Sequence, residues 1–73
     1  MTLTNPRGSP YSAIDYLDDL AALGVTVHAQ GATLFHKTAD LDDFELYGEV
    51  RQRAREAGLT PARVRAAIEE RAI

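Results

Sequence analysis

The sequence contains no cysteine and no tryptophan, and it has no long run of apolar residues. The absence of cysteine excludes disulfides and thiolate metal sites, and it is compatible with a cytoplasmic location. A membrane helix needs about 20 apolar residues, and no segment approaches that length. A chain of 73 residues forms one domain with a marginal core. Packing must therefore stabilise it, and a second copy or a partner can add to that stability.

Motifs for catalysis and cofactor binding are also missing. No serine lies in a nucleophile elbow, and an expected strand separates Gly24 from Gly31, so no phosphate loop forms. His28 and His36 are expected on opposite faces of a hairpin, which rules out a two-histidine metal site. The acidic run over residues 40–45 lacks the ligand spacing of a calcium loop. We therefore expect no enzyme activity, no cofactor and no metal.

The apolar periodicity predicts an α+β domain, with one helix, a two-stranded antiparallel β-hairpin and then two helices. Residues 1–11 contain two prolines and a glycine and are expected to be a flexible lead-in to a single domain over residues 12–73. Ser12 is expected to cap the first helix, which Gly24 ends. The apolar side of this helix holds Ala13, Tyr16, Leu17, Leu20, Ala21 and Leu23, and the opposite side holds Asp15, Asp18 and Asp19.

The hairpin is predicted from alternating apolar and polar residues over 25–29 and 33–37. A turn at Gln30-Gly31 would place Val27 opposite Leu34 and Val25 opposite His36. Phe35 then points away from the Val27 and Leu34 face. Its side chain is either part of a second core face or an exposed anchor for a partner.

The second helix is expected to begin in the acidic run that starts at Ala39 and to end at Ala57, before Gly58. Gly48 inside it costs roughly 1 kcal/mol relative to alanine and is expected to allow close approach of another element. Thr60-Pro61 should start the third helix. Helices one and two should pack on one face of the hairpin, through Leu17, Leu20, Val27, Leu34 and Phe44.

Charge is distributed unevenly along the chain, although the net charge is only −3. Residues 1–47 carry two basic and seven acidic side chains, whereas residues 48–73 carry six and four. Such a division is typical of an interaction surface or of two faces that meet in a dimer. Solvated helix faces explain it equally well.

Residues 17–27, Leu-Asp-Asp-Leu-Ala-Ala-Leu-Gly-Val-Thr-Val, resemble the start of β-hairpin docking domains. These are small N-terminal domains of some bacterial megasynthases, including the tubulysin type. Gly31-Ala32-Thr33-Leu34 is similar to the turn and second strand of that family, and residues 40–55 are similar to its next helix. The resemblance covers about residues 12–57.

The resemblance implies a hairpin that binds a short linear peptide from a partner protein, in a domain that often forms homodimers. A free strand edge offers backbone groups for such a peptide. We therefore expect a non-catalytic interaction module, either a docking domain, an adaptor, or an inhibitor encoded by a phage or plasmid. Core packing is the alternative role for the apolar members of the expected binding set. That set comprises Val27, His28, Leu34, Phe35 and Lys37 on the hairpin and Asp15, Asp18 and Asp19 on the acidic helix face.

A DNA-binding alternative comes from residues 50–70, which resemble a helix-turn-helix around Gly58. Arg63 and Arg65 would lie near the start of the recognition helix, where side chains reach bases. Arginines of the preceding helix would neutralise phosphates; these are Arg51, Arg53 and Arg55. The pattern is short, and an acidic first half repels DNA unless it points away.

Overall fold

The structure is a computed structural model that describes residues 4–71. The elements in chain order are α1 (Ala13–Ala22), β1 (Thr26–Gln30), β2 (Thr33–Lys37), α2 (Phe44–Glu56) and α3 (Pro61–Arg71). This is the helix, hairpin, helix, helix order that the sequence predicts, so the α+β class is confirmed.

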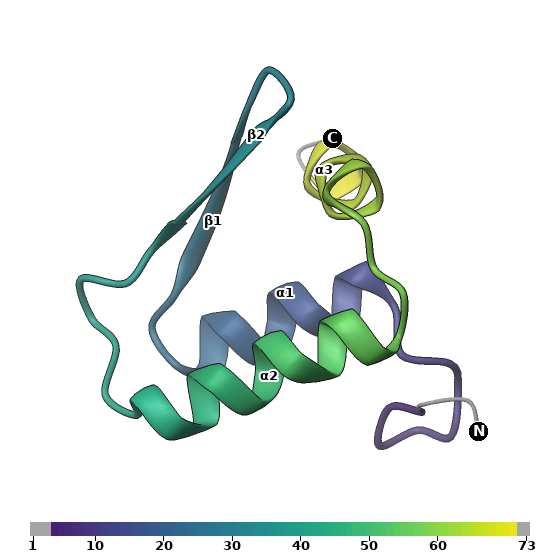
Figure 1. The fold of residues 1–73 in the computed structure, drawn as a ribbon. Coiled ribbons are helices and arrows are strands. Elements are labelled where there is room, and N and C mark those ends of the chain that lie inside the picture. The colour runs from purple at the N-terminus through teal and green to yellow at the C-terminus, as the bar shows by residue number, and fades with distance from the viewer. Residues whose placement is uncertain (1–3, 72–73) are drawn as a thin grey trace.

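The helices and the hairpin are arranged around α1 (Figure 1). α1 and α2 lie side by side and run in opposite directions, and the hairpin rises from the end of α1. α3 is seen along its axis, whereas α2 lies across the view. α1 contacts α2, α3 and β1, which makes it the central element.

Both ends of α1 are fixed by local hydrogen bonds. Ser12 and Asp15 form the predicted capping box, in which each side chain accepts from the backbone N–H of the other residue. At the other end, Gly24 N–H donates to Ala21 C=O (3.1 Å), and Val25 N–H donates to Leu20 C=O (2.9 Å). These bonds form a Schellman motif, with Gly24 at a φ of 82°.

The same turn joins α1 to the core. Leu20 and Val25, which its second hydrogen bond links, are 0% and 2% exposed. The core comprises Tyr11, Ala13, Tyr16, Leu17, Leu20, Val25, Val50, Ala54, Val64 and Ala67. Within residues 4–71, none of the helices has the length and apolar character that a membrane crossing requires.

The hairpin turn lies one residue later in the sequence than expected, and this changes which residues pair across the strands. Val27 pairs with His36, and Leu34 pairs with Ala29. The turn residues are therefore Gly31 and Ala32, and only Gly31 has a positive φ, of 60°. That combination is a type II′ turn, which places glycine first. A turn at Gln30-Gly31 would instead place glutamine first.

The second helix begins later than expected, because Asp43 caps it. The Asp43 side chain accepts from Leu46 N–H at 3.0 Å, and residues 39–43 form the loop before it. Phe44 consequently points to solvent and is 73% exposed, so its expected place in the core is wrong. Leu41 from the loop packs against the core instead.

The hairpin packs mainly against α1 and α3, not against α1 and α2. α3 contacts both strands, and α1 contacts β1. The reason is the short connection through Gly58 and Thr60, which turns α3 back across the hairpin (Figure 1). Val64 and Ala67 are the buried residues of α3. The sequence did not show which surface these residues cover.

Over residues 4–11, the expected lead-in is a loop that packs on α1. Thr4 bridges Pro10, and Asn5 N–H donates to Ser9 C=O at 2.8 Å. Asn5 and Tyr11 are both buried. The remaining residues of the expected lead-in, 1–3, lie outside the described residues.

We predict that Gly24→Ala destabilises the fold by about 2–5 kcal/mol, because a positive φ and a steric clash combine. A Cβ at Gly24 would lie 2.5 Å from the backbone oxygen of Asp40. Gly58→Ala is the matched control, since its φ is 72° and no atom lies within 4 Å of the added Cβ. It should cost only about 1–2 kcal/mol. Urea unfolding measures both, and equal losses would show that the contact with Asp40 is absent.

Candidate functional site

The two faces of the hairpin have different surroundings. Phe35 is 50% exposed and lies opposite His28 on the outer face. Lys37 is also exposed on this face. Val27 and Leu34 are half-buried on the inner face and pack against the core. Of the five hairpin residues expected to bind a partner, three therefore lie on the outer face and two lie on the inner face.

Phe35 has the position expected of an anchor rather than of a core residue. It is not among the apolar side chains that pack against the core, and its partner across the ladder is an exposed histidine. Soluble domains do expose single apolar residues, so exposure alone assigns no role. What distinguishes Phe35 is its place on a sheet of only two strands.

The register also determines which backbone groups point outward from the hairpin. Gln30 and Thr33 flank the turn as a hydrogen-bonded pair, and pairs alternate from there along an antiparallel ladder. The N–H and C=O groups that point away from the ladder therefore belong to Val27 and Ala29 on β1 and to Leu34 and His36 on β2. Within residues 4–71, no backbone group of another element bonds to them.

A groove of about 370 Å³ lies along β1, between that strand and helices α1 and α3. Its lining is mostly apolar and comprises Leu17, Ala21, Val25, Thr26, Val27, His28, Ile68 and Arg71. Val27 and His28 thus meet at this groove although their side chains lie on opposite faces of the strand. The edge of β1 and the groove beside it form one continuous candidate site, and Phe35 lies on the neighbouring strand, outside the groove lining.

The expected acidic face of α1 is largely occupied by contacts inside the chain. Tyr11 Oη donates to Asp19 at 2.7 Å, and Arg53 donates to the same carboxylate oxygen at 3.2 Å. Arg71 pairs with Asp18 at 2.6 Å. Burial, followed by the hydrogen bond to Asp19, raises the pKa of Tyr11. These carboxylates therefore join α1 to the N-terminal loop, α2 and α3.

Asp15 is buried and fixes the N-terminal loop to α1. Its carboxylate accepts from Asn5 Nδ2 (3.0 Å), from Ser12 N–H (2.9 Å) and from Arg7 Nη2 (3.2 Å). Burial opposes ionisation, but the hydrogen bonds from Ser12 and Asn5 and the charge of Arg7 outweigh it and lower the pKa of Asp15. No sequence pattern identified Asn5 as a buried hydrogen-bond donor. Tyr11 was identifiable, because Tyr11 and Tyr16 occupy the two positions of a hydrophobic staple around Ser12.

The five arginines of the DNA-binding alternative do not share one surface. Arg53 pairs with Asp19 of α1 at 3.2 Å, and its Cζ lies 5.8 Å from the Tyr11 ring centroid. Arg65 pairs with Glu69 on its own helix. Arg51 and Arg55 line a cavity beneath the hairpin. Arg63 is exposed near the start of α3.

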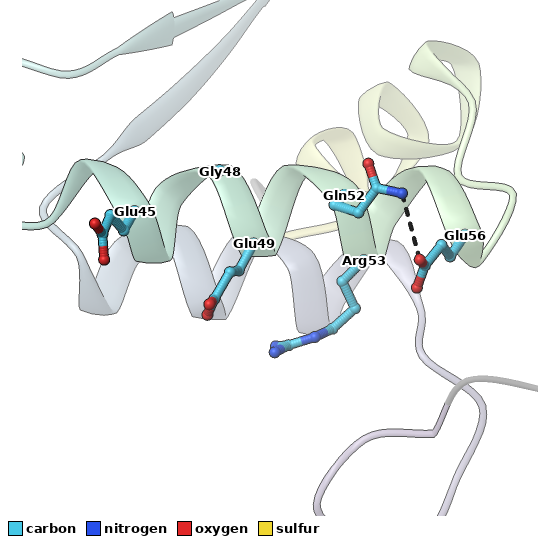
Figure 2. Close-up of a pocket in the computed structure, with 6 residues that line it drawn as sticks. All are labelled: Glu45, Gly48, Glu49, Gln52, Arg53 and Glu56. Atoms are coloured by element: carbon cyan, nitrogen blue, oxygen red, sulfur yellow. Dashed lines mark hydrogen bonds between the residues drawn. The ribbon is translucent and has the colours of Figure 1, made fainter.

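Gly48 is one of the residues that line a shallow hollow on the outer face of α2 (Figure 2). Gly48 lies between exposed polar side chains, and no other element lies within 4 Å of where its Cβ would be. The expected close approach is therefore absent within the described chain. The lining residues are Glu45, Gly48, Glu49, Gln52, Arg53 and Glu56. They all come from one helix, so the hollow does not enclose a ligand.

The described residues were also considered as metal ligands, and the chain was compared with known proteins. Among residues 4–71, no group of three or more histidine and acidic side chains is placed to hold a metal ion. No protein-family model, curated protein or solved structure matches the chain.

We predict that Asp15→Asn lowers the free energy of unfolding at pH 7 by about 1–3 kcal/mol, because buried donors lose a charged acceptor. The pKa of Asp15 in the folded chain lies below its ordinary value of 3.8. Asp15 therefore stabilises the fold fully above that value, and the stabilisation is lost as pH falls through the lowered pKa. Asp15→Asn should flatten this acid decline, measured by urea unfolding between pH 3 and 7.

Asp18→Asn is the control for this experiment. It removes an exposed ion pair with Arg71. Its cost at pH 7 should be below about 1 kcal/mol. A loss at Asp15→Asn that is no larger than this would contradict the anchoring role of Asp15.

Proposed function

We propose that the chain is a non-catalytic protein-interaction module whose hairpin binds an extended segment of a partner along β1. The observation that carries this proposal is the unpaired edge of β1 beside an apolar groove, in a hairpin whose outer face exposes Phe35. The partner is a protein or short linear peptide, or a second copy of the chain. A docking domain, an adaptor and an inhibitor encoded by a phage or plasmid would all use this surface.

The physical basis of the proposal is β-strand addition. A segment that pairs with β1 would bond to the outward N–H and C=O groups of Val27 and Ala29. Alternate side chains of that segment would point toward the groove and toward the outer face of the hairpin, which carries His28 and Phe35, since strand residues alternate between faces. Backbone bonds would then supply affinity, and the groove would supply sequence preference. Neither strand contains a proline, and the strands hold no aspartate, glutamate or arginine and a single lysine, Lys37. The hairpin therefore has little of the usual protection against edge pairing.

We predict that Phe35→Ala weakens partner binding by about 1–3 kcal/mol and leaves the fold largely intact. Peptides that bind the wild-type chain would be selected from a displayed random library and measured by titration calorimetry. Amide NMR signals over residues 25–37 should shift more than those of α3 when the peptide binds. Phe44→Ala is the matched control, because it removes the same side chain from a more exposed position outside the hairpin. Equal effects of the two substitutions, or unfolding by Phe35→Ala, would contradict the proposal.

The DNA-binding alternative is supported by the α2, Gly58 and α3 arrangement alone, since the arginines are dispersed. If it were correct, duplex affinity would fall steeply with salt through counterion release. We predict no salt-sensitive binding to a mixed-sequence duplex at high micromolar protein and low salt, measured by fluorescence anisotropy. If the chain binds the duplex, and the double substitution Arg63→Glu and Arg65→Glu abolishes that binding, then DNA is the ligand and the proposed interaction module is wrong.

A further inference from the structure

A second cavity lies on the inner face of the hairpin, away from Phe35 and the β1 groove. Its volume is about 150 Å³. That is roughly the volume of five waters in the liquid, which suits a small ion rather than a drug-sized ligand. Side chains from α1, β2, α2 and α3 and from the turn before α3 line it, namely Tyr16, Leu34, His36, Arg51, Ala54, Arg55, Leu59, Pro61 and Val64.

The polar lining of this cavity is positive or neutral. Arg51 and Arg55 supply two guanidinium groups, and no carboxylate of the described residues lines the cavity. The first residue of α3, Pro61, also lines it, so the positive end of that helix dipole adds to the potential. The remaining walls are mostly apolar, and electrostatic interactions are stronger beside apolar walls than in open water.

Arg51 and Arg55 bond only to neutral groups within residues 4–71. Arg51 Nη1 donates to Tyr47 Oη at 3.0 Å, and Arg55 Nη2 donates to Gln52 Oε1 at 2.7 Å. By contrast, four other arginines form ion pairs with carboxylates, namely Arg7, Arg53, Arg65 and Arg71. Each guanidinium has five N–H donors, so both retain donors that can reach a ligand.

The spacing of the two arginines also favours a bound anion. They are four residues apart on α2, which places them on the same side of the helix and makes their charges repel. An anion between them would remove that repulsion and accept hydrogen bonds from both. Guanidinium groups match tetrahedral oxyanions well, because each can donate two parallel bonds.

We propose that this cavity binds an oxyanion of phosphate size between Arg51 and Arg55. This site is independent of the proposed docking edge, because it lies at β2 rather than β1 and shares no lining residue with the β1 groove. The ligand is inorganic phosphate or the phosphate group of a larger molecule, and both present the same oxygens to the arginines.

His36 connects anion binding to pH. Its Nε2 lies 2.9 Å from Tyr16 Oη, and burial and the charge of Arg51 lower the pKa of His36. The groups that line the cavity around it are Tyr16 from α1 and Arg51 and Arg55 from α2, and none is acidic. A bound anion would offset the positive charges and allow His36 to be protonated. Anion affinity should therefore rise as pH falls toward 5.

The test is an NMR titration of the whole chain with sodium phosphate and with sodium sulfate, against sodium chloride at equal ionic strength. Sulfate remains a dianion over this pH range, so a change in its affinity reports the protein. We expect shifts at the Nε–H signals of Arg51 and Arg55 and at the His36 ring, and a higher His36 pKa when sulfate is bound. Arg51→Gln and Arg55→Gln should each weaken binding by about ten- to hundredfold.

Arg63→Gln is the matched control, since Arg63 is exposed and is not among the cavity-lining residues. Its affinity for phosphate should equal that of the wild type. Arg55→Gln changes an exposed side chain and keeps the test valid if Arg51→Gln unfolds. Adenosine monophosphate that binds more tightly than phosphate would identify a larger ligand, and equal binding would identify the free ion. Equal affinities in all variants, or the same shifts with chloride, would overturn the proposal.

Discussion

The turn at Gly24 is the constraint on which the arrangement of the other elements depends. The backbone oxygen of Asp40 occupies the space that a side chain at this position would need. The turn therefore fixes the direction in which the hairpin leaves α1 and the path of the loop that returns to α2. It also places Val25 directly beside Leu20 in the core. A second Schellman motif, in which Leu59 N–H donates to Ala54 C=O at 3.0 Å, sets the direction of α3 in the same way.

Charges hold these elements together more than they mark an outer surface. The acidic residues of α1 pair with the N-terminal loop, with α2 and with α3, through Arg7, Arg53 and Arg71. Much of the uneven charge along the sequence is thus matched inside the molecule. The arginines without a carboxylate partner in the described chain are Arg51, Arg55 and Arg63. Two of these three meet at the cavity under the hairpin, which is why that cavity differs from the rest of the surface.

The elements that the sequence predicted well are those determined by local chemistry. Ser12, Gly24 and Thr60-Pro61 gave the helix boundaries, because capping and turn preferences act over a few residues. The placement of Phe35 on the face opposite Val27 and Leu34 was also correct, since it depends only on the alternation of strand side chains. The start of α2 was wrong because several acidic residues compete to cap it, and only the structure shows that Asp43 does so.

Features that depend on distant contacts could not be predicted from the sequence. Nothing local shows that α3 covers the inner face of the hairpin or that Phe44 faces solvent. Asn5 lies in a segment that reads as a polar turn, and its burial depends on the carboxylate of Asp15, ten residues away. The two arginines of the cavity were recognised in the sequence as part of a group of basic residues. Their position beside His36 and Leu34 depends on the tertiary fold.

The proposed docking function requires that the free hairpin has open edges on which a partner strand can pair. Amide hydrogen exchange of the dilute chain, followed residue by residue by NMR, tests it most directly. We expect slow exchange at His28 and Phe35, whose amides bond across the ladder, and fast exchange at the outward amides of Val27, Ala29, Leu34 and His36. Equally slow exchange at all six amides would show that the edges are already covered, and it would contradict the claim.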